Sequence, residues 1–163
     1  MKLNASPAIM AFALIVSPLA VQADDSHADM VMQHGAQVMP FDQSQAMHMF
    51  LPDSNGGVLE IVVHDMDQAQ ISLVRSHLLQ EAAKFTSGNY SDPAYIHGKT
   101  MPGLDQLQSG ALRVSVRYFE TPTGAAITFT TTDREMVSAI HQWLAAQQRD
   151  HNSGPVKRCD MKM

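Results

Sequence analysis

The chain has 163 residues, the length of a single domain, and its 16 acidic side chains outnumber its 11 basic ones. The formal net charge of −5 at pH 7 argues against nucleic-acid binding, because contact with phosphates needs concentrated lysine and arginine. A hydrophobic fraction of 45% excludes global disorder. The unusual feature is a supply of 12 methionines and 8 histidines, whose side chains are soft and borderline metal ligands.

The first 23 residues have the pattern of a secretory signal peptide. Lys2 precedes an apolar run at 8–16, and Val21-Gln22-Ala23 is a cleavage site of the small-x-small type. The run is too short to span a bilayer, and no later segment reaches the roughly 18 apolar residues that a transmembrane helix needs. We therefore predict an exported protein, periplasmic or secreted, with no transmembrane segment. Its single cysteine, Cys159, cannot close an intramolecular disulfide.

The first half of the mature chain predicts an arm, a hairpin and a helix. Residues 24–45 are polar, rich in Met and His and without clear periodicity, which predicts a flexible arm. Alternating apolar residues predict strands over 47–50 and 58–64, joined by a turn at 52–57. Asp67 then has the character of a helix N-cap. One apolar stripe follows it at helical spacing: Ile71, Val74, Leu78, Ala82 and Phe85.

The second half repeats this order after a long connection. Residues 88–110 carry several Gly and Pro, and two short helical turns are expected there, at Ser91-Asp92-Pro93 and at Pro102-Gly103-Leu104. Strands are predicted over 112–118 and 125–130, on either side of a turn at 121–124. Asp133 caps a second helix, whose apolar stripe is Met136, Ile140, Trp143 and Leu144.

The two halves predict one architecture. Asp67 precedes Leu78 by 11 residues, and Asp133 precedes Leu144 by the same number. We therefore predict an α+β fold, a ββα-ββα pseudo-repeat, in which a four-stranded antiparallel sheet carries two helices on one face. The domain would occupy residues 46–151, followed by a flexible tail over 152–163.

Met-x-Met occurs three times, at Met30-Val31-Met32, Met47-His48-Met49 and Met161-Lys162-Met163. Thioether sulfur and imidazole nitrogen suit Cu(I) far better than Mg²⁺ or Ca²⁺. The alternative is that methionine is adaptable packing material, and that Met47 and Met49 share one strand face in a core. Methionines in an unstructured arm have no core to fill, which favours a ligand role for them.

Three further histidines lie where a site could form. His97 and Met101 flank glycine-rich loop sequence and could converge on one ion, or His97 could lock the loop through a backbone hydrogen bond. His77 borders the apolar stripe of its helix, either as a ligand or as a hydrogen-bond partner of Glu81 one turn later. In Asp150-His151 the carboxylate could orient the imidazole, or the pair could only cap the helix end.

Several enzyme signatures are absent from the sequence, which contains no Gly-rich phosphate loop, no G-x-S-x-G elbow and no H-E-x-x-H motif. A third hypothesis is an enzyme that uses His77 and His97 as acid and base and Arg75 as an anion clamp. The sequence nevertheless favours a binding protein over an enzyme.

Several short segments, spread over most of the mature chain, share their order and spacing with a known family. They are His34-Gly35, Met39 with Phe41, His48 with Phe50, Gly56-Gly57, Arg75-Ser76-His77-Leu78, Asp92-Pro93, Ile96-His97-Gly98, Met101-Pro102-Gly103 and Asp150-His151. In these the chain resembles a family of small exported bacterial domains of unassigned function. The resemblance implies that His48, His77 and His97 belong to one recurrent pattern and meet in space; it implies no activity.

The functional hypothesis is an exported metal-binding protein that handles copper or confers tolerance to it. The structured site is predicted to contain His48, His77, His97 and Met101, and an accessory capture segment would contain Met30, Met32, His34 and Met39. The alternative is a periplasmic interaction or small-ligand-binding module without metal. That module would use the sheet face left uncovered by the helices, with Arg113, Arg117 and Glu60.

Overall fold

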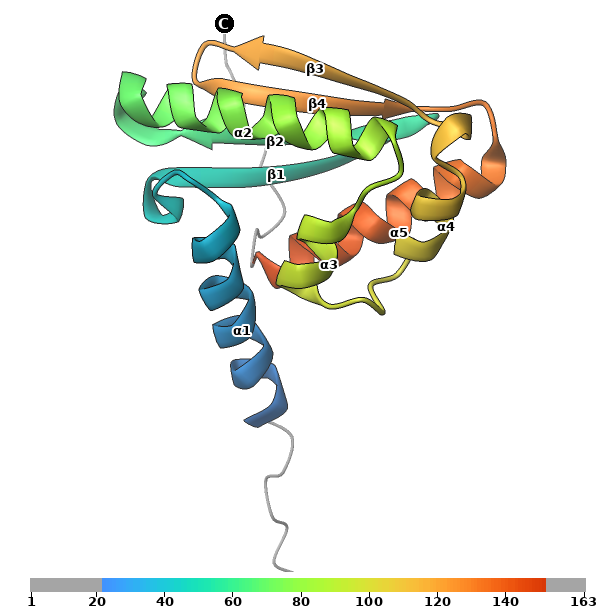
Figure 1. The fold of residues 1–163 in the computed structure, drawn as a ribbon, viewed down its shortest axis with the longest axis horizontal. Coiled ribbons are helices and arrows are strands. Elements are labelled where there is room, and N and C mark those ends of the chain that lie inside the picture. The colour runs from blue at the N-terminus through green and yellow to red at the C-terminus, as the bar shows by residue number, and fades with distance from the viewer. Residues whose placement is uncertain (1–21, 152–163) are drawn as a thin grey trace, which may run out of the picture.

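The computed structural model describes residues 22–151 (Figure 1). Its helices and strands, in chain order, are α1 (Gln22–Val38), β1 (Ala46–Asp53), β2 (Gly56–Val63), α2 (Gln68–Thr86), α3 (Ser91–His97), α4 (Leu104–Ser109), β3 (Ser115–Thr121), β4 (Gly124–Thr130) and α5 (Arg134–Asp150). The predicted signal peptide, apart from its last two residues, and the predicted tail over 152–163 lie outside the described residues. Both remain predictions.

The strands form one antiparallel sheet in the order β1-β2-β4-β3. Each hairpin contributes its second strand to the centre, where Leu59 of β2 faces Ile127 of β4. Both of these side chains are buried, and α2 and α5 pack on the sheet face that carries them. The predicted α+β fold, with a four-stranded antiparallel sheet and two helices on one face, is confirmed.

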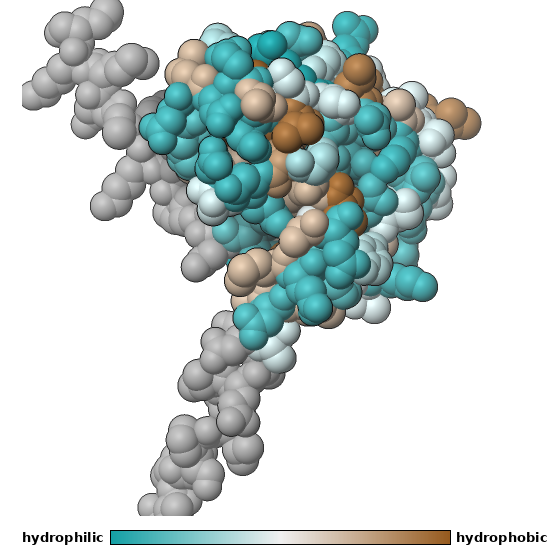
Figure 2. Space-filling view, turned by 60° about the vertical axis from the view of Figure 1, so that its left-hand side comes forward, coloured by the Kyte–Doolittle hydropathy of each residue, from teal (hydrophilic) through white to brown (hydrophobic). Residues whose placement is uncertain are grey.

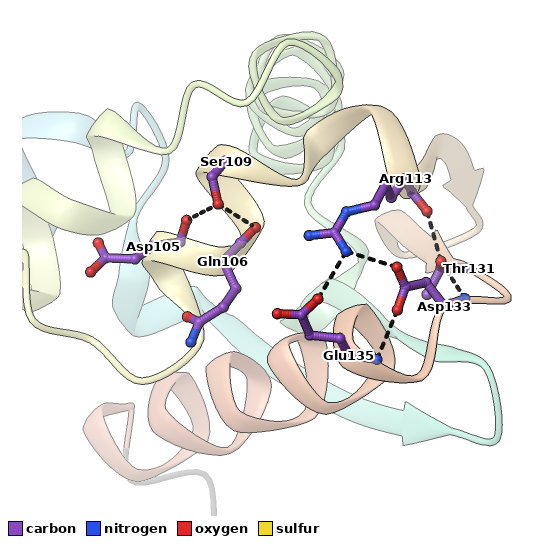
Figure 3. A network of polar contacts seen from close by, with 7 residues as sticks. All are labelled: Asp105, Gln106, Ser109, Arg113, Thr131, Asp133 and Glu135. Carbon is purple, nitrogen blue, oxygen red and sulfur yellow. Dashed lines mark hydrogen bonds and ion pairs between the residues drawn. The ribbon is translucent and has the colours of Figure 1, made fainter.

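The two long helices begin where the sequence predicts. A carboxylate oxygen of Asp67 accepts hydrogen bonds from the backbone N–H groups of Ala69 and Gln70, at 2.8 and 3.2 Å. Asp133 accepts from the N–H of Glu135 at 2.9 Å, which satisfies a free donor of the first turn of α5. Arg113 clamps this helix start from outside, donating to Asp133 at 2.8 Å and to Glu135 at 2.9 Å (Figure 3).

The core lies between the sheet and the two helices. Val74 of α2 and Ile140 of α5, which correspond in the pseudo-repeat, are both 0% exposed. Trp143 is also 0% exposed and meets the rings of Phe85, Tyr90 and Phe129 at centroid distances of 5.3–5.8 Å. The side of the molecule seen in Figure 2 is largely hydrophilic with separate hydrophobic patches, as enclosure of the apolar side chains requires. Over residues 22–151, no helix combines the length and hydrophobicity needed to cross a membrane.

The structure differs from the prediction for the N-terminal segment. Residues expected in a flexible arm form α1, which projects from the sheet and packs beside α3 (Figure 1). Val31 of α1 is 5% exposed. The imidazole of His34 stacks on Tyr95 with a centroid distance of 4.4 Å, and its Nδ1–H donates to the Tyr95 carbonyl at 2.7 Å. The apolar face of α1 is too narrow to give a helical period that can be recognised in the sequence. The residues that α1 contacts, such as Tyr95, are also far from it in the sequence.

The remaining differences are local. The connection over 88–110 contains α3 and α4, close to the two predicted helical turns. The third strand begins at Ser115 rather than at residue 112, because Ala111–Arg113 form a short 3-10 turn. Leu112, expected to face the core as part of that strand, is fully exposed.

Candidate functional site

A small cavity of about 50 Å³ opens between the inner face of β1, α2, α3 and the end of α5. Four histidines line it, each from a different element: His48 of β1, His77 of α2, His97 of α3 and His151 just after α5. The thioether of Met39, in the link between α1 and β1, lines it as well. The three histidines that the sequence singles out therefore border one space.

His48 owes its position to strand alternation. Phe50, two residues later, is 3% exposed, and His48 shares its sheet face and is 8% exposed. Phe41 and Phe50 flank the imidazole at centroid distances of 5.9 and 6.3 Å. Among the described residues its Nε2 atom is buried without a hydrogen-bond partner. A buried polar nitrogen without a hydrogen-bond partner destabilises the fold by about 1–3 kcal/mol, unless another group binds to it.

His77 lies beside the apolar stripe of α2, as the sequence predicts, and meets the edge of Phe41 at a centroid distance of 5.8 Å. Its expected partner, Glu81, is instead bonded by the ammonium of Lys84 at 2.8 Å. Lys84 also donates to Asp92 of α3 at 2.6 Å. This acidic and basic cluster closes one side of the cavity. Among residues 22–151, no carboxylate pairs with the imidazole of His77.

The end of α5 brings an aspartate and a histidine to the site. The Nδ1–H of His97 donates to Oδ2 of Asp150 at 2.9 Å, and Oδ1 of the same carboxylate lies 3.3 Å from Nε2 of His27 on α1. His151 stacks on His48 with a centroid distance of 4.5 Å and meets His97 edge-on at 5.0 Å. His151 is thus in ring contact with two other imidazoles.

Burial sets the charge of these side chains. Desolvation lowers the pKa of His48 and of His77 to about 4 and that of His151 to about 2. The pKa of His97 is also lowered by burial, against the opposing influence of the Asp150 carboxylate. All four imidazoles are therefore neutral at pH 7, the form that coordinates metal ions. Burial raises the pKa of Glu81 to about 7.

The other residues predicted as ligands lie elsewhere. Met101 is 7% exposed in the hydrophobic core and is absent from the cavity lining, because the turn between α3 and α4 directs it inward. Met30 and Met32 lie on α1, where Met32 is 63% exposed, and His34 is engaged with Tyr95. Met39 is the one member of the predicted capture segment that lines the cavity.

His151 is the site residue that sequence reasoning undervalues. The adjacent Asp150-His151 pair is a visible signal, but it fits a helix cap equally well. The carboxylate does orient an imidazole, as one interpretation held, although the imidazole is that of His97 rather than its neighbour. Arg75, considered as an anion clamp, donates to the carbonyls of Thr121 and Gly124 and so holds the second hairpin in place.

Within residues 22–151, no three His, Cys, Asp or Glu side chains are already placed to hold a metal ion. His151 is stacked on His48, and because an imidazole nitrogen binds an ion in the plane of its ring, two stacked rings do not point their nitrogens at one ion. Metal binding at this site therefore requires an imidazole to rotate.

Two other surfaces bear on function. A larger hollow of about 610 Å³ between α3 and α4 is lined mostly by polar residues and by none of the predicted ligands. The sheet face that α2 and α5 leave uncovered exposes Met47, Leu51 and Phe119, each by 41–48%. Met47 and Met49 thus lie on the face opposite to the core, which contradicts the packing interpretation. Arg113 is not on this face, because it belongs to the 3-10 turn and pairs with α5.

Comparisons with protein-family models, with curated proteins and with solved structures found no match. The function is therefore inferred from the residues of the site.

Proposed function

We propose that this protein is exported and binds a transition-metal ion, copper first among them, at the cavity that His48, His77, His97 and His151 line. The observation that carries the proposal is the meeting of four neutral imidazoles and one thioether around a single small space. Imidazole and thioether together form a soft to borderline ligand set, which disfavours Ca²⁺ and Mg²⁺.

The size of the cavity supports an ion rather than an organic ligand. About 50 Å³ is room for about three water molecules, whereas pockets for small organic molecules enclose ~300–1,000 Å³. Once an imidazole has rotated, an ion that keeps one water ligand matches this volume better than a sugar or a nucleotide does.

The buried Nε2 atom of His48 supports a ligand role for that residue. Its neutral ring offers a lone pair inside an apolar wall of Phe41 and Phe50. Rotation of His151 about its side-chain bonds would take its ring out of the stack and turn one of its own nitrogens towards the same ion.

The methionines of α1 keep their proposed accessory role. Met32 is exposed and Met30 half-buried on a helix that packs beside α3, so both are accessible to an ion outside the cavity. Met39 connects that helix to the cavity wall. His34 stays in the capture set as well, because its Nδ1–H bond to the Tyr95 carbonyl leaves the lone pair of a neutral ring on Nε2.

The test is a Cu(I) titration of the purified protein against a chromophoric chelator, with Cu(II) and Zn(II) titrated in parallel. Stoichiometric binding that is lost in His48→Ala and in His97→Ala supports the cavity as the site. His64→Ala is the matched control, because His64 is an exposed histidine just beyond β2. Binding that survives both cavity variants and disappears with Met30→Leu/Met32→Leu would move the site to α1. Absence of binding for all three ions would refute the proposal.

The uncovered sheet face favours a second candidate, an interaction module. Exposed apolar side chains gathered on one sheet face are typical of protein contacts. Glu60 and Arg117 add opposite charges on that face. If no metal binds, this face becomes the leading functional surface, and Leu51→Lys would weaken association with a partner recovered from the same compartment.

A further inference from the structure

Asp150 occupies an unusual place for a carboxylate. It is the last residue of α5, where the helix macrodipole is negative and a cation would be stabilising. Its side chain is 17% exposed, and that of His97, to which it is bonded, is 2% exposed. Helix stability does not explain an acidic side chain at this position. The contact of the Asp150 carboxylate with His97 explains it.

The chemistry of the pair defines the protonation of the ring. An ionised carboxylate can only accept hydrogen bonds, so the nitrogen 2.9 Å from Oδ2 of Asp150, His97 Nδ1, must carry a hydrogen. A neutral imidazole has one N–H and one lone pair. The lone pair of His97 therefore lies on Nε2, the nitrogen on the far side of the ring from Asp150.

We propose that Asp150 is a positioning residue that fixes His97 as the Nδ1–H tautomer and so presents Nε2 as a ready donor to a metal ion in the cavity. The part of this proposal that concerns metal rests on the proposed function, whereas the tautomer does not. Histidine ligands in metal sites commonly donate their other N–H to a carboxylate, which fixes the ring and raises its basicity.

The second oxygen of Asp150 provides a matched control. Oδ1 lies 3.3 Å from Nε2 of His27, whose side chain is 41% exposed on α1. His27→Ala removes this contact and leaves the bond between Oδ2 and His97 in place. His27→Ala removes one partner of the carboxylate, whereas Asp150→Ala removes the carboxylate itself and so deprives His97 of its acceptor.

The tautomer is measured by long-range ¹H–¹⁵N correlation NMR on the metal-free, full-length protein near pH 7. We expect the Nδ1–H pattern for His97 in the wild type and in His27→Ala, and the Nε2–H pattern in Asp150→Ala. A wild-type His97 that shows the Nε2–H pattern overturns the proposal without any variant. Retention of Nδ1–H in a folded Asp150→Ala protein, judged by its amide spectrum, overturns it as well.

Cu(I) competition on the same three proteins tests the metal part. Asp150→Ala should lower the affinity by about 10- to 100-fold, the usual effect of losing such a partner, and His27→Ala should leave it within about twofold. Equal affinities in all three proteins would refute the role of Asp150 in metal binding. If the wild type binds no ion, the proposed function fails, while the NMR result still decides whether Asp150 sets the tautomer.

Discussion

His48 gives a direct link between the site and the stability of the fold. Its pKa is lowered from 6.5 to about 4, first because burial disfavours the charged ring. Between these two pH values the unfolded chain binds a proton at this position and the native protein does not. The free energy of unfolding therefore falls as the pH decreases from about 6.5 to about 4. A shift of this size corresponds to about 3 kcal/mol for the single residue.

The perturbation that isolates this contribution is His48→Phe. The new ring has two phenylalanine neighbours, Phe41 and Phe50, and the adjacent cavity of about 50 Å³ can accept its extra volume. At pH 7 the variant should be more stable by about 1–3 kcal/mol, because the unpartnered buried Nε2 disappears. Towards pH 4 its advantage should grow by about 3 kcal/mol.

Urea unfolding of both proteins at several pH values between about 4 and 7 measures the difference. His77 and His151 also destabilise the native state as the pH falls, and Glu81, whose pKa is raised to about 7, destabilises it as the pH rises. The contributions of His77 and Glu81 are present in wild type and variant alike and cancel in the comparison. That of His151 rests first on its own burial, but repulsion from His48 is a second cause of its lowered pKa and is absent from the variant. Parallel pH profiles for the two proteins, or a variant less stable at every pH, would refute the burial argument for His48.

Four further substitutions test the fold and the limits of the site. Trp143→Ala empties the centre of the core and should destabilise the protein by about 3–5 kcal/mol in urea unfolding, so a loss below 1 kcal/mol would contradict its packing. Met101→Leu should change stability by less than about 1.5 kcal/mol and leave the Cu(I) affinity of the wild type intact; a weaker affinity would return Met101 to the site. Asp133→Ala should lower stability by about 1 kcal/mol through the lost N-cap, an effect visible as a decrease in Tm. Gly103→Ala should destabilise by more than about 1 kcal/mol, since its φ of 80° is left-handed and an added Cβ would clash with the Ala139 carbonyl oxygen; an unchanged Tm would show that the turn can adjust.

Local patterns were enough to predict the scaffold. Alternation marks the strands, and apolar residues at helical spacing mark α2 and α5. Asp67 and Asp133 cap these helices through backbone donors only two or three residues away. Interactions of such short range depend only on neighbouring residues in the sequence, and the pseudo-repeat could be predicted for that reason. The helix α1 was missed because its stabilising contacts, such as that of His34 with Tyr95, join residues 61 positions apart.

The site was predictable only in part. The sequence by itself determined that His48 shares a strand face with Phe50, because alternation fixes this, and that His77 borders the apolar stripe of its helix. Only the tertiary structure decided which face α5 covers, and hence that its far end brings His151 against His48 and Asp150 against His97. It also placed Met101 in the core instead of the cavity. Side chains from four separate elements meet through the packing of those elements, a long-range outcome that no local spacing encodes.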